Sequence, residues 1–123
     1  MTDSFVTYEL RDRVALITID DGKANAISHA ITDALGDALS RARTEAGAVV
    51  LAGRPGRFSA GFDLSVMTSS PEAARGLLAA GAGVAIDIHE FPMPVVIAST
   101  GHALAMGAIL LMAADVRIGA EGT

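Results

Sequence analysis

The sequence contains no cysteine and no tryptophan, and only 4% of its 123 residues are aromatic. Without cysteine there is no disulfide, no thiolate metal site and no cysteine nucleophile. The chain also has no run of lysine and arginine, and its formal net charge is −5. Such a chain would be repelled by a phosphate backbone, so we expect no nucleic-acid partner. Its start, Met1 to Ser4, lacks the basic and apolar regions of a secretory signal, and we expect a cytoplasmic protein.

What the chain has instead is small aliphatic residues, which raise the hydrophobic content to 51%. A chain of this length is one domain at most, and its composition fits close-packed helices and strands with both faces covered. It is apolar for its size, so we expect some of its surface to lie against missing partners. The longest apolar stretch, Pro94 to Ala114, is interrupted at Ser99 to His102. We therefore interpret it as strand, turn and buried helix, and predict no membrane span.

The first half of the chain predicts a hairpin, a helix and a strand. Residues Phe5 to Leu10 alternate apolar and polar side chains, and Val14 to Ile19 returns after a polar turn. Ser28 is suited to cap a helix. Apolar residues then recur on one helical face, namely Ile31, Leu35, Ala38, Leu39 and Ala42. A short apolar strand is predicted at Ala48 to Ala52.

The second half alternates in the same way. Met67 to Ser70 has the composition of a mobile loop, and Ser70 and Pro71 predict the cap and first turn of a long helix that ends before Pro92. Its apolar stripe is Leu77, Val84, Ile88 and Phe91. The remaining predicted elements are a strand at Pro94 to Ser99, a helix at Met106 to Ala114 and a strand at Asp115 to Gly119. Strands alternating with helices indicate an α/β fold built from crossover units, without an internal domain boundary.

Two junctions rich in small residues stand out, Arg57 to Leu64 and Thr100 to Ala108. Each is predicted to lead from a buried strand through a tight turn into a helix. Gly61 can adopt positive φ, and free backbone N–H groups at such turns can receive a negatively charged oxygen. Together they outline an oxyanion hole and suggest chemistry on a carbonyl. Taken singly, each junction is better explained by glycines that merely let elements pack closely, and only the pair favours the oxyanion hole.

The order and spacing of these segments resemble the crotonase superfamily of enoyl-CoA hydratases and isomerases. The family's opening segment is similar to Val14 to Asp20 together with Lys23 to Ser28. Its first oxyanion loop is similar to Phe58 to Leu64, and its second is similar to Gly101 to Asp115. The resemblance covers essentially the whole chain. It implies a crotonase-like spiral of β-β-α repeats, incomplete at the C-terminus.

Family members are about twice this length, and their C-terminal helices build trimers. We therefore expect residues 1–123 to be the N-terminal part of a single acyl-CoA-binding domain, in a full-length protein that forms homotrimers or hexamers. The alternative is a complete small domain.

The resemblance also implies site residues. The backbone N–H groups of Phe62 and Met106 would form the oxyanion hole for a coenzyme A thioester, which is the substrate, so no further cofactor or metal is expected. The family usually has glycine where Met106 stands, and we expect its side chain to narrow the acyl pocket. The substrate-binding residues implied are Lys23, Ala24, Asn25, Ser59, Ala60, Gly61, Asp63 and Leu64. For Asp63 a helix-capping role is favoured over that of an acid, and a solvated loop lysine is the alternative for Lys23.

A second departure from the family is Ile109, because hydratases carry a glutamate at that position. Isoleucine can neither take nor give a proton, whereas an isomerase needs only the family's other acid, which would lie beyond Thr123. An isomerase that shifts a double bond is therefore favoured. The alternatives are a hydratase with altered acid/base residues, a non-catalytic acyl-CoA-binding or assembly protein and, more weakly, a hydrolase.

Overall fold

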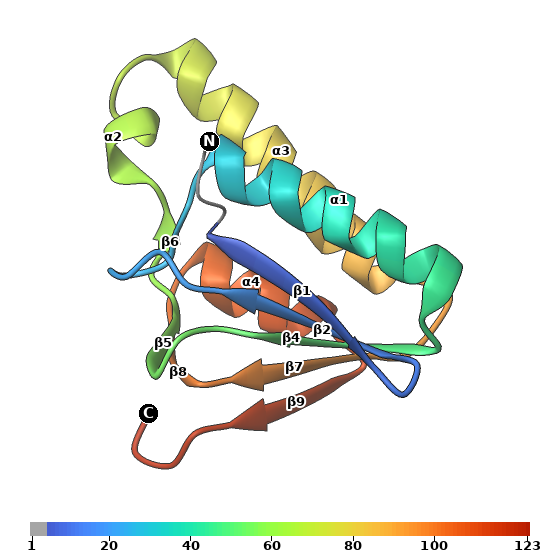
Figure 1. Cartoon of the computed structure of the whole chain (residues 1–123). Helices are drawn as coiled ribbons and strands as arrows, with labels where there is room; N and C mark the ends of the chain where they lie inside the picture. The colour runs from blue at the N-terminus through green and yellow to red at the C-terminus, as the bar shows by residue number, and fades with distance from the viewer. Residues whose placement is uncertain (1–4) are drawn as a thin grey trace.

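The computed structural model describes residues 5–123; residues 1–4, on which the argument against a secretory signal rests, lie outside that range. The chain forms a mixed α/β structure (Figure 1). In order, its elements are β1 (Val6–Arg11), β2 (Val14–Ile19), β3 (Ala26–Ile27), α1 (His29–Glu45), β4 (Ala48–Ala52), β5 (Gly56–Ser59), β6 (Gly61–Phe62), α2 (Leu64–Met67), α3 (Pro71–His89), β7 (Val95–Ser99), β8 (Gly101–Ala103), α4 (Met106–Ala113) and β9 (Val116–Gly119).

The main sheet has five strands in the order β1-β2-β4-β7-β9. Strand β1 is antiparallel to β2, and the other pairs are parallel. Asp12 and Arg13 join β1 to β2 with φ of 46° and 69°, the left-handed conformation that suits a tight hairpin between twisted strands. The predicted hairpin is thus confirmed, with the first strand shifted by one residue and the second at its predicted bounds.

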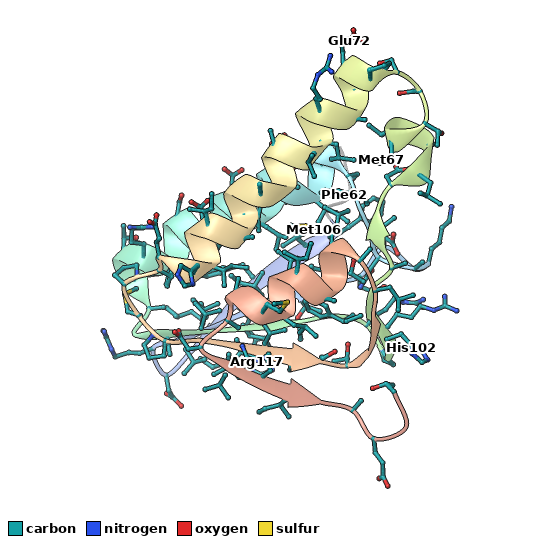
Figure 2. The ribbon with its side chains drawn as sticks, turned by 180° about the vertical axis from the view of Figure 1, so that it is seen from behind. Phe62, Met67, Glu72, His102, Met106 and Arg117 are labelled. Atoms are coloured by element: carbon teal, nitrogen blue, oxygen red, sulfur yellow. The ribbon has the colours of Figure 1, made fainter. Side chains whose placement is uncertain are left out.

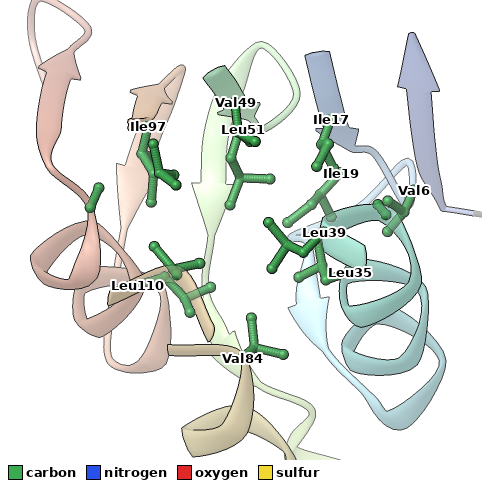
Figure 3. Packing of buried hydrophobic residues seen from close by; sticks show 14 of the residues in the cluster. Val6, Ile17, Ile19, Leu35, Leu39, Val49, Leu51, Val84, Ile97 and Leu110 are labelled. Carbon is green, nitrogen blue, oxygen red and sulfur yellow. The ribbon is translucent and has the colours of Figure 1, made fainter. Parts of the chain in front are cut away.

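The core lies between one face of this sheet and the helices α1, α3 and α4 (Figure 1). Alternate strand residues such as Ile17, Val49 and Ile97 are fully buried on that face. They point toward helix residues such as Leu35 and Leu110 (Figure 3). The period-two burial of the strands therefore meets the apolar stripes of the helices.

The other face of the sheet is only half-buried within residues 5–123, because the intervening positions of β2, β4 and β7 keep partial exposure. Every residue of β9 is exposed, with Val116 at 49% and Ile118 at 58%. The expectation that both faces are covered is therefore wrong for the described residues. Apolar side chains are thus exposed, as expected, and their cover by missing partners stays a prediction.

Both predicted helix caps are present. Ser28 accepts a hydrogen bond from the Ile31 N–H at 3.3 Å, and Ser70 accepts one from the Ala73 N–H at 3.0 Å. Because the side-chain oxygen satisfies an N–H that has no helical acceptor, each serine fixes where its helix begins. Helix α3 ends at His89, before Pro92, as the sequence predicts.

The loop predicted at Met67 to Ser70 is partly wrong, because Met67 is the last residue of the short helix α2. The two strand–turn–helix junctions also need correction: β5 and β6 lie in the first and β8 in the second. In the stretch Pro94 to Ala114 the strand and the helix are confirmed, but the predicted turn is wrong, because β8 follows β7 after the single residue Thr100. The helix is buried on one face only, since Ile109 and Met112 are 50% and 77% exposed. Within residues 5–123 the structure contains no helix with the length and apolarity needed to cross a membrane.

Candidate functional site

The two small-residue junctions meet in space through the parallel pairing of β5 with β8, in which Gly56 lies opposite Gly101. A Cβ atom placed on Gly101 would overlap the Gly56 carbonyl carbon, so only glycine allows the two backbones to come this close. These glycines can therefore both let the elements pack closely and help to form an oxyanion hole. The packing is what brings the junctions together.

Beyond β5 the contact continues at Gly61, which has a φ of +102°. A Cβ atom placed there would lie 2.9 Å from Ala105 Cβ and 3.5 Å from the Met106 backbone nitrogen. The start of β6 therefore lies directly against the start of α4. The residues that follow, Phe62 on one segment and Met106 on the other, are those that the sequence singles out as oxyanion donors.

The N–H of Phe62 is directed away from the neighbouring strand β3. Phe62 pairs with Ile27 in the parallel β3–β6 ladder, and the Asp63 N–H donates to the Ile27 carbonyl at 2.8 Å. Consecutive N–H groups of an extended strand point in opposite directions. Since Asp63 points its N–H to β3, Phe62 presents its own on the other side.

Met106 is the first residue of α4, and within residues 5–123 its N–H donates to no acceptor. The next N–H, that of Gly107, donates to the Leu104 carbonyl at 2.8 Å. Ala105, which precedes the helix, has φ 51° and ψ −119°, a conformation that residues other than glycine rarely adopt. An unpartnered N–H at a helix start is suited to receive an anionic oxygen.

Ser59 connects both donor-bearing segments. Its Oγ donates to the Asn25 carbonyl at 2.8 Å and accepts from the Gly61 N–H at 3.1 Å. Its carbonyl accepts from the Leu104 N–H at 2.9 Å. Ser59 is 0% exposed, and a Cβ on Gly107 would lie only 2.5 Å from the Ser59 carbonyl oxygen. This serine therefore holds β6 and the start of α4 from within the core.

Asn25 is equally buried and adopts a left-handed φ of 54°. Its Nδ2 donates to the carbonyls of Ile19 and Phe58 at 2.8 and 3.1 Å, and its Oδ1 accepts from the Asp21 N–H at 2.9 Å. Asn25 and Ser59 were both predicted as substrate-binding. In this structure their side chains serve neighbouring backbone and do not reach the surface.

The side chains of Phe62 and Met106 converge beneath α3 (Figure 2). A Cβ on Gly81 of α3 would lie 2.5 Å from Phe62 Cε1 and 3.3 Å from Met106 Cε. Met106 is 4% exposed and belongs to the core. Its side chain thus packs under α3, rather than standing free at the mouth of a pocket.

Other predicted binding residues line two cavities, one beside β3 and α1 and one beside β5 and β8. The larger, about 400 Å³, is lined by Phe5, Asp21, Lys23, Ala24, Ala26, Ser28, Ile31 and Asp63. A smaller one, about 150 Å³, is lined by Ala24, Arg57, Ala60, His102 and Leu104. The structure thus groups Lys23, Ala24 and Asp63, and links Ala60 to them through Ala24. Leu64 is 74% exposed and lines neither cavity.

Two arginines, which the sequence reasoning missed, hold the Lys23 loop. The Lys23 carbonyl accepts hydrogen bonds from Arg54 Nη1 at 2.6 Å and from Arg57 Nη1 at 3.5 Å. Their position depends on β5, which the sequence did not predict. No local signal could therefore have assigned them.

Asp63 caps α2, the role that the sequence favours over that of an acid. Its Oδ1 accepts hydrogen bonds from the Ser65 N–H at 2.9 Å and the Ser65 hydroxyl at 2.7 Å. The hydroxyl bond lowers the pKa of this carboxyl below its ordinary value, and the backbone bonds act in the same direction. Asp63 is therefore a carboxylate that is hydrogen-bonded to Ser65 of α2.

Two other acidic residues, Glu72 and Asp115, line neither of these two cavities. Glu72 lies exposed at the far end of α3 (Figure 2), and Asp115 Oδ2 accepts from the Val95 N–H at 2.8 Å. Ile109 on α4 is 50% exposed. Residues 5–123 contain no group of histidine and carboxylate side chains that could hold a metal ion. The arrangement can bind an anionic oxygen through backbone N–H groups. None of Asp63, Glu72 and Asp115 supplies the carboxylate that Ile109 lacks.

Comparison with known proteins gives matches over most of the chain. The family model described as enoyl-CoA hydratase/isomerase matches residues 9–123. A probable enoyl-CoA hydratase of Bacillus subtilis is 37% identical over 112 residues, which are 88% of this chain and 43% of the relative. The peroxisomal enoyl-CoA delta isomerase 1 of Arabidopsis thaliana is 29% identical over 113 residues, 89% of this chain and 47% of the relative.

Among solved structures, an enoyl-CoA hydratase/isomerase family protein from Pseudomonas syringae superposes with a TM-score of 0.94 at 45% identity, covering 97% of this chain and 52% of that one. An enoyl-CoA isomerase of Mycobacterium tuberculosis gives a TM-score of 0.92 at 42% identity, covering 97% and 52%. The chain thus spans about half the length of the proteins that it matches. The fold class predicted from the resemblance is confirmed.

Proposed function

The chain belongs to the enoyl-CoA hydratase/isomerase family, and we propose that its two junctions form the oxyanion hole of an acyl-CoA enzyme of the isomerase type. The observation that carries this proposal is the contact of Gly61 with Ala105 and Met106. It brings the N–H groups of Phe62 and Met106 to facing segments, where both can donate to one thioester oxygen. The positive end of α4 adds to the attraction.

In this reaction a base removes a proton from C2 of a 3-enoyl-CoA, and negative charge moves through the conjugated system onto the thioester oxygen. The proton returns at C4, so the double bond moves to the 2,3 position without net loss or gain of atoms. The two N–H groups stabilise the oxygen while it carries charge. Removing one such donor typically lowers the rate by about 10²–10³.

Ile109 is the reason to favour isomerisation over hydration. Hydration needs acid/base groups to handle the added water, and Ile109 stands where the family's hydratases have glutamate. Asp63 is engaged by Ser65, and Asp115 by the Val95 N–H. We place the single base of the isomerase outside residues 5–123.

The coenzyme A part of the substrate would lie along the cavities at Lys23, Ala24 and Asp63. Lys23 is exposed there, and an ammonium group favours phosphate. Asn25, Ser59 and Gly61 would act by shaping the neighbouring backbone. The trimeric assembly implied by the resemblance stays a prediction.

The test is a parallel assay of the full-length protein with trans-3-hexenoyl-CoA and with crotonyl-CoA. We expect conversion of the 3-enoyl thioester to its conjugated isomer, with little hydration of crotonyl-CoA. Fast hydration of crotonyl-CoA would contradict the argument from Ile109 and favour the hydratase alternative. Tight binding of both thioesters without turnover would favour the non-catalytic binder.

A further inference from the structure

We propose that the side chains of Phe62 and Met106, seated against Gly81, form the wall that limits the length of the acyl chain. This inference rests on the proposed function, because it takes the N–H groups of the same two residues as the carbonyl donors. It adds a specificity role that the comparisons do not assign, and it predicts a preference for short acyl-CoA substrates.

The wall is fixed relative to the carbonyl by covalent geometry. Each donor N–H and the side chain behind it belong to one residue, so both side chains begin within a few bonds of the bound oxygen. Phe62 is held by its pairing with Ile27 and Met106 by its position at the start of α4. The wall therefore cannot move far without moving the donors.

Gly81 shows that the space behind the donors is filled. A Cβ there would lie 2.5 and 2.6 Å from Cε1 and Cζ of Phe62 and 3.3 Å from Cε of Met106, well inside normal contact distance. Leu77 and Val84, about one turn away on either side of Gly81, are also buried. Within residues 5–123 the side chains of Phe62 and Met106 therefore fill the space between the donors and α3 at Gly81 (Figure 2).

The opposite direction is open. The cavity of about 400 Å³ is lined by Lys23, Ala24 and Asp63, where we place coenzyme A, and the cavity of about 150 Å³ shares Ala24 with it. A thioester carbonyl carries its sulfur on one side and its acyl group on the other. With coenzyme A on the open side, the acyl group runs toward the wall, which then sets how long it can be.

The test uses Phe62→Ala in the full-length protein, a change that keeps the backbone N–H and removes the ring. We measure kcat/KM for 3-enoyl-CoA substrates from hexenoyl to dodecenoyl. The ratio of long-chain to short-chain kcat/KM should rise on the order of tenfold or more, the scale of discrimination by apolar pockets. Phe91→Ala is the matched control, because Phe91 is a buried phenylalanine after the end of α3, and its ratio should stay at the wild-type value.

A second variant tests the cause. In Phe62→Ala/Gly81→Ala the new methyl group enters the space that the ring left, so the ratio should fall back toward that of the wild type. If Phe62→Ala does not fold, Phe62→Leu replaces it, with a smaller shift in the same direction.

The outcomes separate the two claims. A wild-type protein that turns over no thioester of any length refutes the proposed function, and this inference with it. An active wild type whose long-to-short ratio is unchanged by Phe62→Ala and by Phe62→Leu refutes the wall alone.

Discussion

Gly81 is the position where a single methyl group should disturb the site most directly without touching a polar atom. In Gly81→Ala the new Cβ would lie 2.5 Å from Phe62 Cε1, whereas carbon atoms at their energy minimum are about 3.5–4.0 Å apart. The ring must therefore move by about 1 Å or α3 must shift away. Phe62 is paired with Ile27 of β3, and Met106 Cε would lie only 3.3 Å from the same Cβ. Both residues therefore oppose these movements.

Two effects of this substitution oppose each other. Overpacking of a filled core typically costs about 1–3 kcal/mol. Replacing glycine by alanine inside a helix contributes about 1 kcal/mol in the favourable direction. Gly76, also within α3, isolates the second effect, because a Cβ placed there meets no atom within 4 Å. Gly76→Ala should therefore be stabilising by about that amount.

The assay is urea unfolding of the wild type, Gly81→Ala and Gly76→Ala, with the slope m held as a check on the two-state treatment. The free energy of unfolding of Gly81→Ala should lie about 1–3 kcal/mol below that of Gly76→Ala. If the two variants are equally stable, Phe62 does not fill the space at Gly81, and the wall argued above does not exist.

Three further substitutions test other parts of the site. Ser59→Ala leaves the buried Gly61 N–H and the Asn25 carbonyl without their partner, so the free energy of unfolding should fall by about 1–3 kcal/mol. In kinetic measurements kcat should fall by a larger factor than KM rises. An unchanged kcat would mean that Ser59 does not position the donors. Asp63→Ala removes the α2 cap. Since the pKa of Asp63 is lowered in the folded state, its stabilisation is present above about pH 4 and is lost as the pH falls through the lowered value. The stability difference between this variant and the wild type should therefore vanish in strong acid, and a difference that persists there would contradict the ionic cap. Gly101→Ala puts a methyl group into the Gly56 backbone and should prevent folding or cost more than about 3 kcal/mol, which circular dichroism and thermal unfolding would detect; a variant as stable as the wild type would disprove the β5–β8 contact.

The long elements could be predicted from the sequence because their signals are local. Serine caps at Ser28 and Ser70, a proline at the start of α3 and apolar periods of two or three to four residues all lie within the segments that they define. The short strands had no such signal. Strand β6 has two residues, and its partner Ile27 lies 35 positions earlier, so its pairing depends on the tertiary structure.

The roles of the candidate site residues stay predictions, and their structural surroundings could be predicted only in part for the same reason. Asn25 and Ser59 are polar residues, which usually indicates exposure, yet glycines elsewhere in the chain let the backbone close over them. Gly81 has the helical spacing of Leu77 and Val84 but no apolar side chain to complete the stripe. Only the fold shows that the gap is filled by Phe62 from a strand 19 residues earlier.

The most direct test of the proposed oxyanion hole is an absorption measurement on the full-length protein with 4-dimethylaminocinnamoyl-CoA. Hydrogen bonds to the carbonyl of this conjugated thioester draw charge toward its oxygen and move its absorption to longer wavelength. We predict a clear red shift on binding, reduced in Ser59→Ala at saturating ligand. Saturable binding, shown by calorimetry, with no change in absorption would mean that Phe62 and Met106 do not polarise a thioester carbonyl.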